Sequence, residues 1–272
     1  MRRTEVLVDD LDHPEGVAWD PASGVLWAGG EAGQLYRVDL DARTWSEAAR
    51  APGFVLGMAV DGRSRLAVCC GEALCVYDGA VRTLHDGFTQ PNYAAFAPDG
   101  TLYFSDSGHW ARDNGRVHRL DVDGTLDVFS DGLPHFPNGC AVSADGAFLW
   151  MVESYRPALS RFDLATGAVE EVVRLPGTVP DGVALAVEGG VVVSCYRPDR
   201  ILYVDMSGSV ETIAEDPQGT LLAAPTNVVF VGPDRDRLVS ANLGRWHLTL
   251  VDAGLHGVPL HHPETWAADA HG

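Results

Sequence analysis

One short motif recurs six times along the chain, and each copy opens a segment with the alternation of a β-strand. The copies begin at residues 13, 54, 90, 136, 179 and 225 and read HPEGVAWDPASG, FVLGMAVDGRSR, QPNYAAFAPDGT, FPNGCAVSADGA, VPDGVALAVEGG and PTNVVFVGPDRD. Their aligned key positions are Glu15, Gly57, Asn92, Asn138, Asp181 and Asn227. Each copy passes through an Asp-Gly or Gly-rich turn into a second alternating strand, which is a strong signal for a β-hairpin.

The spacing of the copies indicates how many strands each repeat contains. The key positions lie 42, 35, 46, 43 and 46 residues apart, which leaves room for four strands per copy. Repeats of this length are typical of β-propeller blades. We therefore predict an all-β, six-bladed β-propeller with four antiparallel strands per blade, as a single domain over residues 1–272. The alternative, a β-sandwich with chance similarity between strands, is disfavoured by turn chemistry shared among six copies.

The ends of the chain and the polarity of the blades make two further predictions. The N-terminal segment TEVLVDDL precedes the first copy, so we expect it to complete the last blade and close the ring. In an antiparallel blade every innermost strand starts on the same face of the disc. The six key positions should therefore surround one mouth of the central channel.

The predicted ring carries the oxygen ligands of a hard cation. It offers two carboxylates and two amides, those of Glu15, Asp181, Asn92 and Asn138. Asn227 is a candidate fifth ligand and Gly57 contributes none. A ligand set without His or Cys suits Ca²⁺ best, with Mg²⁺, Mn²⁺ or Zn²⁺ as alternatives. Taken singly, Asn, Asp and Gly are ordinary turn residues, but their recurrence at equivalent positions favours one bound divalent cation.

Loops between the second and third strands should lie on the same face as this ring. Four of the six combine aromatic with basic or imidazole side chains: His109, Trp110 and Arg112; Tyr155 and Arg156; Tyr196 and Arg197; Arg245, Trp246 and His247. Aromatic walls with few polar groups are typical of small-molecule pockets. We expect a small-molecule substrate to contact Gln90, Asn92, His109, Trp110, Tyr155, Arg156, Tyr196, Arg197 and Trp246. The alternative is that each Arg closes its own loop by pairing with a carboxylate such as Asp113 or Asp199.

The motifs HPEG, PN followed by DG and LYFSD, FPNG and PDG resemble those of the SMP-30/gluconolactonase/luciferin-regenerating-like family over nearly the whole chain. The resemblance implies a catalytic divalent cation held by Glu15, Asn138 and Asp181, with Asn92 as a fourth ligand or a substrate contact. It also implies hydrolysis of a lactone or similar ester. Sugar-lactone members usually carry an Arg two residues before the Asn of the third blade. Gln90 occupies that position here, so we expect sugar lactones to be poor substrates.

In the expected reaction the cation polarises the carbonyl and activates water, and Asp181 is the general base. Three alternatives keep the fold. The same cation site could hydrolyse a phosphoester, it could serve a biosynthetic isomerisation or condensation, or the cation could only stiffen a non-catalytic binding propeller. The chain has no G-x-S-x-G elbow, Gly-rich phosphate loop or Rossmann fingerprint, which disfavours the chemistries that depend on them.

Composition limits the partners of the chain. Lys+Arg 19 against Asp+Glu 38 gives a net charge of -19 without a basic run, which disfavours nucleic acid and anionic membranes. No apolar run approaches a membrane span and the N-terminus lacks a signal-type hydrophobic region, so we expect a cytoplasmic protein. The five cysteines match no zinc or disulfide framework and are expected to be buried free thiols. Cys69 and Cys75, which flank a predicted hairpin, are the alternative pair.

Overall fold

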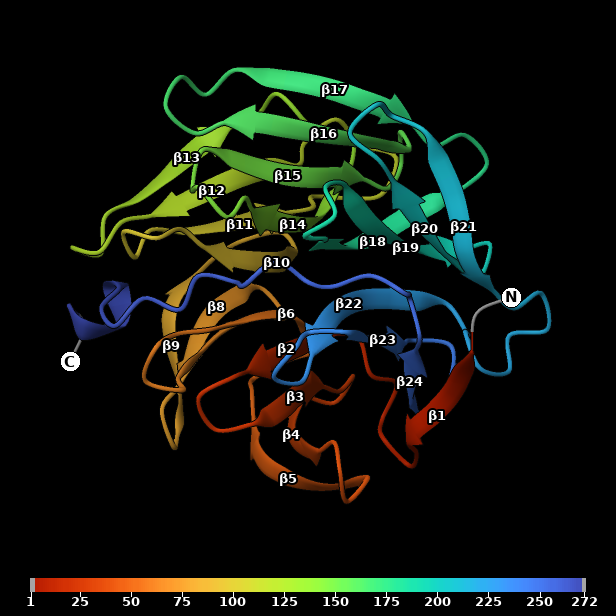
Figure 1. The fold of residues 1–272 in the computed structure, drawn as a ribbon. Helices are drawn as coiled ribbons and strands as arrows, with labels where there is room; N and C mark the ends of the chain where they lie inside the picture. Colours follow the sequence, from red (N-terminus) through yellow and green to blue (C-terminus); the bar gives the residue numbers. More distant parts are fainter. Residues whose placement is uncertain (1–2, 271–272) are drawn as a thin grey trace.

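The computed structural model describes residues 3–270, so residues 1, 2, 271 and 272 of the expected single domain lie outside the described part. Six four-stranded antiparallel sheets form a ring around a central channel, and each sheet runs outward from the channel to the rim (Figure 1). This arrangement confirms the predicted all-β six-bladed propeller with four strands per blade.

The first five blades each use four strands that are consecutive in the chain. Blade 1 contains β2 (Val17–Asp20), β3 (Val25–Gly29), β4 (Gln34–Asp39) and β5 (Thr44–Arg50). Blade 2 contains β6 (Val55–Val60), β7 (Leu66–Cys70), β8 (Ala73–Tyr77) and β9 (Val81–Asp86). Blade 3 contains β10 (Pro91–Phe96), β11 (Leu102–Asp106), β12 (Arg116–Leu120) and β13 (Leu126–Ser130). Blade 4 contains β14 (Pro137–Val142), β15 (Phe148–Glu153), β16 (Ala158–Asp163) and β17 (Val169–Arg174). Blade 5 contains β18 (Val179–Leu185), β19 (Val191–Arg197), β20 (Arg200–Val204) and β21 (Val210–Glu215).

Blade 6 joins the two ends of the chain. It contains β22 (Pro225–Val231), β23 (Arg237–Asn242) and β24 (Leu248–Val251), and its fourth strand is β1 (Thr4–Val8). β1 pairs antiparallel with β24, with Thr4 opposite Val251. The expected ring closure by the N-terminal strand is therefore confirmed, and β1 lies beside β24 in Figure 1.

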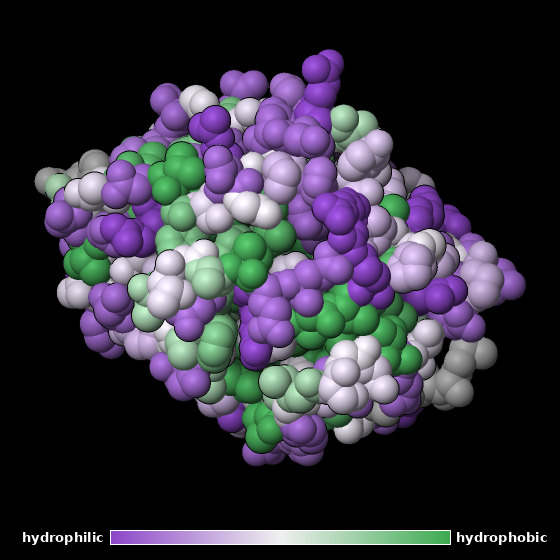
Figure 2. Space-filling view, turned by 90° about the horizontal axis from the view of Figure 1, so that it is seen from above, coloured by the Kyte–Doolittle hydropathy of each residue, from purple (hydrophilic) through white to green (hydrophobic). Residues whose placement is uncertain are grey.

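Apolar side chains fill each of the six blade-to-blade interfaces. The described residues form six hydrophobic clusters, and each cluster combines side chains from two neighbouring blades. Inner strands such as β14 are buried along their whole length, whereas β17 at the rim has three exposed residues followed by three half-buried ones. Viewed from the β17 side, the rim is mostly hydrophilic with separate apolar patches (Figure 2). This burial gradient is expected for sheets that pack face to face around an axis.

Strand alternation decides which cysteines meet. All five cysteines are free and buried, as predicted. Cys69 packs toward blade 3, whereas Cys70 and Cys75 pack toward blade 1, because successive residues of a strand point to opposite faces. The Sγ atoms of Cys70 and Cys75 are 3.0 Å apart. The alternative pairing of Cys69 with Cys75 was therefore wrong, because Cys70 is the residue that meets Cys75.

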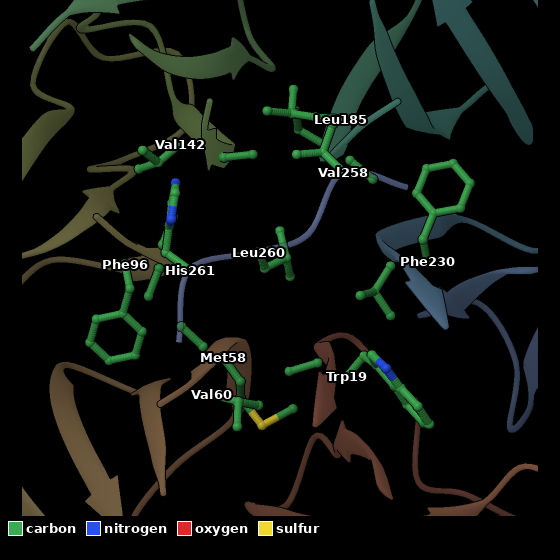
Figure 3. Close-up of a pocket in the computed structure, with 18 of the residues that line it drawn as sticks. Trp19, Met58, Val60, Phe96, Val142, Leu185, Phe230, Val258, Leu260 and His261 are labelled. Atoms are coloured by element: carbon green, nitrogen blue, oxygen red, sulfur yellow. The ribbon is translucent and has the colours of Figure 1, made fainter. Parts of the chain in front are cut away.

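Residues 252–269, here called the C-terminal strap, cross one end of the channel. Leu260 lies at the centre of the opening, surrounded by side chains from the inner strands (Figure 3). The Val258 amide donates to the Leu185 carbonyl at 2.9 Å, and His261 Nε2 lies 2.8 Å from the Ser143 carbonyl oxygen. A cavity of about 130 Å³ with largely apolar walls remains between the strap and the channel.

The strap ends in the 3-10 helix η1 (Ala267–Asp269), just after a buried tryptophan. Trp266 has no exposed surface, and its ring packs edge-on against Phe96 at a centroid distance of 5.1 Å. Its indole N–H donates to Asp61 Oδ2 at 2.8 Å. The strap is thereby fixed to blades 2 and 3. No helix within residues 3–270 is long and apolar enough to cross a membrane.

Candidate metal centre

One residue of each blade occupies the same place at the start of the inner strand. Register defines this ring position, because the residue before it pairs with the second strand: Val55 with Cys70, Pro91 with Asp106, Pro137 with Glu153, Pro180 with Cys195 and Pro225 with Asn242. The ring residues are therefore Leu56, Asn92, Asn138, Asp181 and Thr226. In blade 1 the ring residue is Glu15, which lies two residues before the Val17–Ala28 pair, as Asn92 lies two residues before the Ala94–Phe104 pair. The sequence alignment was one residue late in blades 2 and 6, where it selected Gly57 and Asn227.

The four predicted ligand residues meet at one cavity. Glu15, Asn92, Asn138 and Asp181 come from four blades and line a cavity of about 370 Å³ at the channel mouth opposite the strap. Each residue is only 2–6 % exposed. Thr226 instead donates its hydroxyl to the Glu15 carbonyl at 2.9 Å, and the Asn227 amide N–H donates to the same carbonyl at 3.3 Å. Blade 6 therefore holds the backbone of Glu15.

Glycines let the inner strands approach each other at this mouth. Gly16, Gly139 and Gly182 directly follow Glu15, Asn138 and Asp181. A Cβ atom on Gly16 would lie 2.1 Å from the Leu56 carbonyl oxygen, and one on Gly139 would lie 2.2 Å from that of Asp181. Any side chain there would push neighbouring blades apart. The glycines therefore allow side chains from different blades to converge.

Two serines orient the two amides. Asn92 Nδ2 donates to Ser107 Oγ at 3.0 Å, and Asn138 Nδ2 donates to Ser154 Oγ at 3.1 Å. Each serine hydroxyl in turn donates to a carbonyl of the next blade at 2.7 Å, Ser107 to Pro137 and Ser154 to Pro180. Both amide nitrogens are thereby engaged within the protein. The two Oδ1 atoms are left as free acceptors.

Each of the four residues keeps one buried oxygen without a hydrogen-bond partner: Glu15 Oε2, Asn92 Oδ1, Asn138 Oδ1 and Asp181 Oδ1. Burial raises the pKa of Glu15, and the nearby Asp181 charge raises it further. Burial also raises the pKa of Asp181, to about 7, against the opposing effect of an Asn138 hydrogen bond. Orphaned oxygens and crowded carboxylates are costly without a cation. The donor set therefore fits a divalent ion that prefers oxygen ligands, such as Ca²⁺.

These raised pKa values predict how the stability of the metal-free protein depends on pH. Because each carboxyl has a higher pKa folded than unfolded, the folded state binds more protons between the two values. The stabilisation is complete below the unfolded pKa values near 4 and is lost as the pH rises through about 7. We expect the melting temperature of EDTA-treated protein to fall between about pH 5 and pH 8.

Two controls isolate this effect in a thermal-denaturation series. Saturating Ca²⁺ should abolish most of the fall, because the cation stabilises both carboxylates. The double variant Glu15→Gln/Asp181→Asn should show a shallower fall even without the cation. A metal-free wild-type protein that is as stable at pH 8 as at pH 5 would contradict the assignment of these two groups.

The same cavity contains some of the predicted substrate contacts. Gln90, Asn92, Trp110, Tyr196 and Arg197 line it. His109, Tyr155, Arg156 and Trp246 do not line it. Tyr155 instead packs edge-on against Trp110 at 5.3 Å, and Trp246 packs against His13 at 5.7 Å.

Of the predicted basic residues, Arg197 alone reaches the cavity. Its Nη1 donates to Asp199 Oδ1 and to the Tyr196 carbonyl, each at 2.8 Å. This pairing is the alternative foreseen for the loop arginines. Arg197 therefore brings little uncompensated positive charge to the site.

Sequence reasoning missed most of the inner wall of the cavity. Phe54, Phe136 and Val179 line it, and each lies two residues before a ring position. The alternation of the strands could have predicted these three residues, because residues i and i+2 point to the same face. Ser107 and Ser154 were also missed. A serine follows the second strand only in the two blades whose ring residue is Asn.

A second group of metal-compatible side chains lies apart from this ring. Ligand atoms of Asp12, His13 and Glu31 are within 4.8 Å of one another, and these residues are half-buried or exposed. Asp12 Oδ2 already accepts from Gln34 Nε2 at 2.9 Å and from the Ala32 amide at 3.1 Å. The ring is the better cation site because its four free oxygens are buried.

Fold and site together define a six-bladed propeller with an oxygen-lined cavity at one end of its channel. Within that class, the chain belongs to the SMP-30/gluconolactonase/LRE-like family, whose model matches residues 13–241. This match confirms the resemblance recognised in the sequence motifs. No curated protein sequence matches the chain.

Solved structures of similar fold include a gluconolactonase, a regucalcin and a luciferin-regenerating enzyme. A gluconolactonase from Xanthomonas campestris is 23% identical, with a TM-score of 0.78 over 93% of this chain and 89% of its own. Regucalcin from Agrobacterium tumefaciens, described as a calcium-binding protein, is 19% identical, with a TM-score of 0.78 over 96% and 97%. A luciferin-regenerating enzyme is 18% identical, with a TM-score of 0.77 over 96% and 100%. At these identities the likeness shows the fold.

Proposed function

We propose that the protein is a divalent-cation-dependent hydrolase of a lactone or a related small ester. One observation carries the proposal: four buried oxygens without hydrogen-bond partners converge from four blades on a single cavity. Membership of a family named for gluconolactonase supports the reaction class. The similarity to a regucalcin described as calcium-binding supports Ca²⁺ as the first cation to test.

Glu15, Asn92, Asn138 and Asp181 would hold the cation. When bound, a divalent ion supplies Lewis acidity for a carbonyl oxygen and for water. Ser107 and Ser154 keep the amide oxygens of Asn92 and Asn138 turned toward the cavity. The backbone contacts from blade 6 hold Glu15 in place.

Asp181 is the residue we assign as general base. Its carboxylate would accept a proton from the attacking water and return it to the leaving oxygen of the opened ester. Its burial and its position on the cavity wall are compatible with this role. Glu15, at the start of blade 1, would act only as a ligand and would exchange no proton.

Phosphoester hydrolysis is less well supported by the cavity. Phosphoryl groups are commonly bound by Arg or Lys side chains that neutralise their charge. Arg197 lines this cavity, but Asp199 already neutralises it. A lactone or carboxylic ester is neutral and needs no such clamp.

Removing and restoring the metal tests the proposal. Protein stripped with EDTA should hydrolyse neither lactones nor aryl esters, and one equivalent of Ca²⁺, Mg²⁺, Mn²⁺ or Zn²⁺ should restore activity. The assay follows acid release from a panel of lactones, with a phosphotriester for comparison, and calorimetry measures stoichiometry. Near-stoichiometric binding without turnover of any substrate would favour the non-catalytic propeller. Failure to bind any divalent ion would remove the mechanism altogether.

A further inference from the structure

The wall of the cavity outside the ligand ring is largely apolar. This apolar wall consists of Phe54, Leu56, Trp110, Phe136, Val179 and Leu243. It extends over blades 2 to 6, since Phe54 and Leu56 belong to blade 2 and Leu243 follows β23 of blade 6. The ring position of blade 2 is itself apolar, because Leu56 replaces a ligand there. A bound molecule would thus meet hydrocarbon immediately beside the metal centre.

The polar groups of the cavity outside the ligands are few and mostly engaged. Ser154 accepts from Asn138 and donates to the Pro180 carbonyl. Arg197 is paired with Asp199. The Gln90 side chain and the Tyr196 hydroxyl remain as groups that can serve a substrate hydroxyl. A ring with several hydroxyl groups would leave most of them without partners, at roughly a tenfold loss of binding for each one.

The backbone leading into the inner strand sets the direction of one residue of this wall. Phe136 has a φ of 65°, in the left-handed region that a bulky residue rarely adopts. His13 and Ala224, which also lie two residues before a ring position, have φ values of 40° and 50°, so this conformation belongs to the blade repeat. The Phe136 ring contacts Trp110 edge-on at 5.1 Å and precedes the ligand Asn138 by two residues. The two rings form a continuous aromatic surface beside the ligands.

We propose that the substrate is a lactone or ester carrying an apolar substituent, and that this substituent binds the apolar wall beside the cation. The inference rests on the proposed function and specifies its substrate class. The reacting carbonyl would lie beside the cation held by the four ligand residues. An alkyl or aryl group would then cover Phe136, Trp110 and Leu56. A cavity of about 370 Å³ suits a small molecule of this kind.

A matched series of six-membered lactones tests the inference. δ-Valerolactone, its methyl, propyl and pentyl derivatives, and glucono-δ-lactone share one reacting group and differ in substituents. Burial of each methylene should raise kcat/KM roughly threefold, so the pentyl derivative should exceed unsubstituted δ-valerolactone by more than tenfold. It should exceed glucono-δ-lactone by about a hundredfold or more. Turnover of glucono-δ-lactone equal to or faster than the pentyl derivative would overturn the inference.

Variants of the wall locate the effect. Trp110 is 51% exposed, so Trp110→Ala should leave the fold intact. It should lower kcat/KM for the pentyl lactone about tenfold and for δ-valerolactone much less. Trp45→Ala on the outer strand β5 is a matched control, and both values should stay within twofold of the wild type. Equal losses on both lactones in Trp110→Ala would contradict a role in recognising the substituent.

A binding measurement separates this inference from the proposed hydrolase. The pentyl-substituted δ-lactam cannot be hydrolysed readily, and calorimetry with Ca²⁺-loaded protein measures its affinity against unsubstituted δ-valerolactam. Tighter binding of the pentyl lactam, lost in Trp110→Ala, would support the apolar wall even if no lactone were hydrolysed. Equal affinities would overturn the inference even if metal-dependent lactonase activity were found.

Discussion

Asp181→Asn should lower kcat by about 10²–10⁴-fold at saturating cation, because general-base assistance is typically worth that much. The amide keeps a neutral oxygen for the metal but cannot accept a proton at neutral pH. Loss of one charge will also weaken cation binding, so metal occupancy must be measured by calorimetry alongside the steady-state rate. Asp181 is buried in the cavity wall with one free oxygen, so the change affects the site directly.

Asp127→Asn is the matched control for this prediction. Asp127 lies on the outer strand β13 with its side chain 59% exposed, and its neutralisation should change kcat by less than twofold. If Asp181→Asn bound the cation and kept full activity, Asp181 would be a ligand only. The base would then have to be a second water molecule. His247 is not free for this role, because its Nε2 lies 3.0 Å from the Leu221 carbonyl oxygen.

Trp266→Ala should destabilise the protein by about 3–5 kcal/mol, as expected when a fully buried aromatic side chain is truncated. The change removes the ring that packs on Phe96 and the donor to Asp61. Chemical denaturation monitored by circular dichroism gives the free energy of unfolding. The C-terminal strap would lose its main attachment to blades 2 and 3.

Two comparisons make this second prediction specific. Trp266→Phe keeps an aromatic ring and removes only the N–H donor, while Arg65 still donates to Asp61 Oδ2 at 2.6 Å, so the loss should be about 1–2 kcal/mol. Trp246→Ala removes an indole that is 52% exposed and should cost less than about 1 kcal/mol. Similar losses in Trp266→Ala and Trp246→Ala would show that the strap contributes little to stability.

The repeat predicted the fold because each blade obeys the same local rules of strand, turn and strand. It placed four candidate ligand residues at the ring position, since Glu15, Asn92, Asn138 and Asp181 were aligned in register and line one cavity. It placed blades 2 and 6 one residue late. A one-residue slip moves a side chain to the opposite face of a strand, and only pairing with the second strand revealed that Leu56 and Thr226 occupy the ring.

The wall of the cavity was harder to predict than the ring. Aromatic loop residues such as Tyr155 and Trp246 drew attention by composition, yet composition cannot tell a residue that faces the cavity from one that faces its neighbour. Phe54 and Phe136 were passed over because they precede the inner strands and resemble ordinary core residues. The C-terminal strap gave no periodic signal, since it forms no strand and makes its contacts through isolated hydrogen bonds, scattered apolar residues and the anchoring Trp266.

Pairing of β1 with β24 has a consequence for folding during synthesis. Thr4 leaves the ribosome long before its partner Val251, and at about 5–20 residues per second the delay is roughly 12–50 s. During that time β1 and the apolar face of blade 1 lack their final neighbours, because the first hydrophobic cluster is shared with blade 6. Unpaired edges and exposed apolar faces promote aggregation. We expect a nascent chain stalled before blade 6 to be protease-sensitive and chaperone-dependent, whereas a chain released beyond Val251 can close its ring.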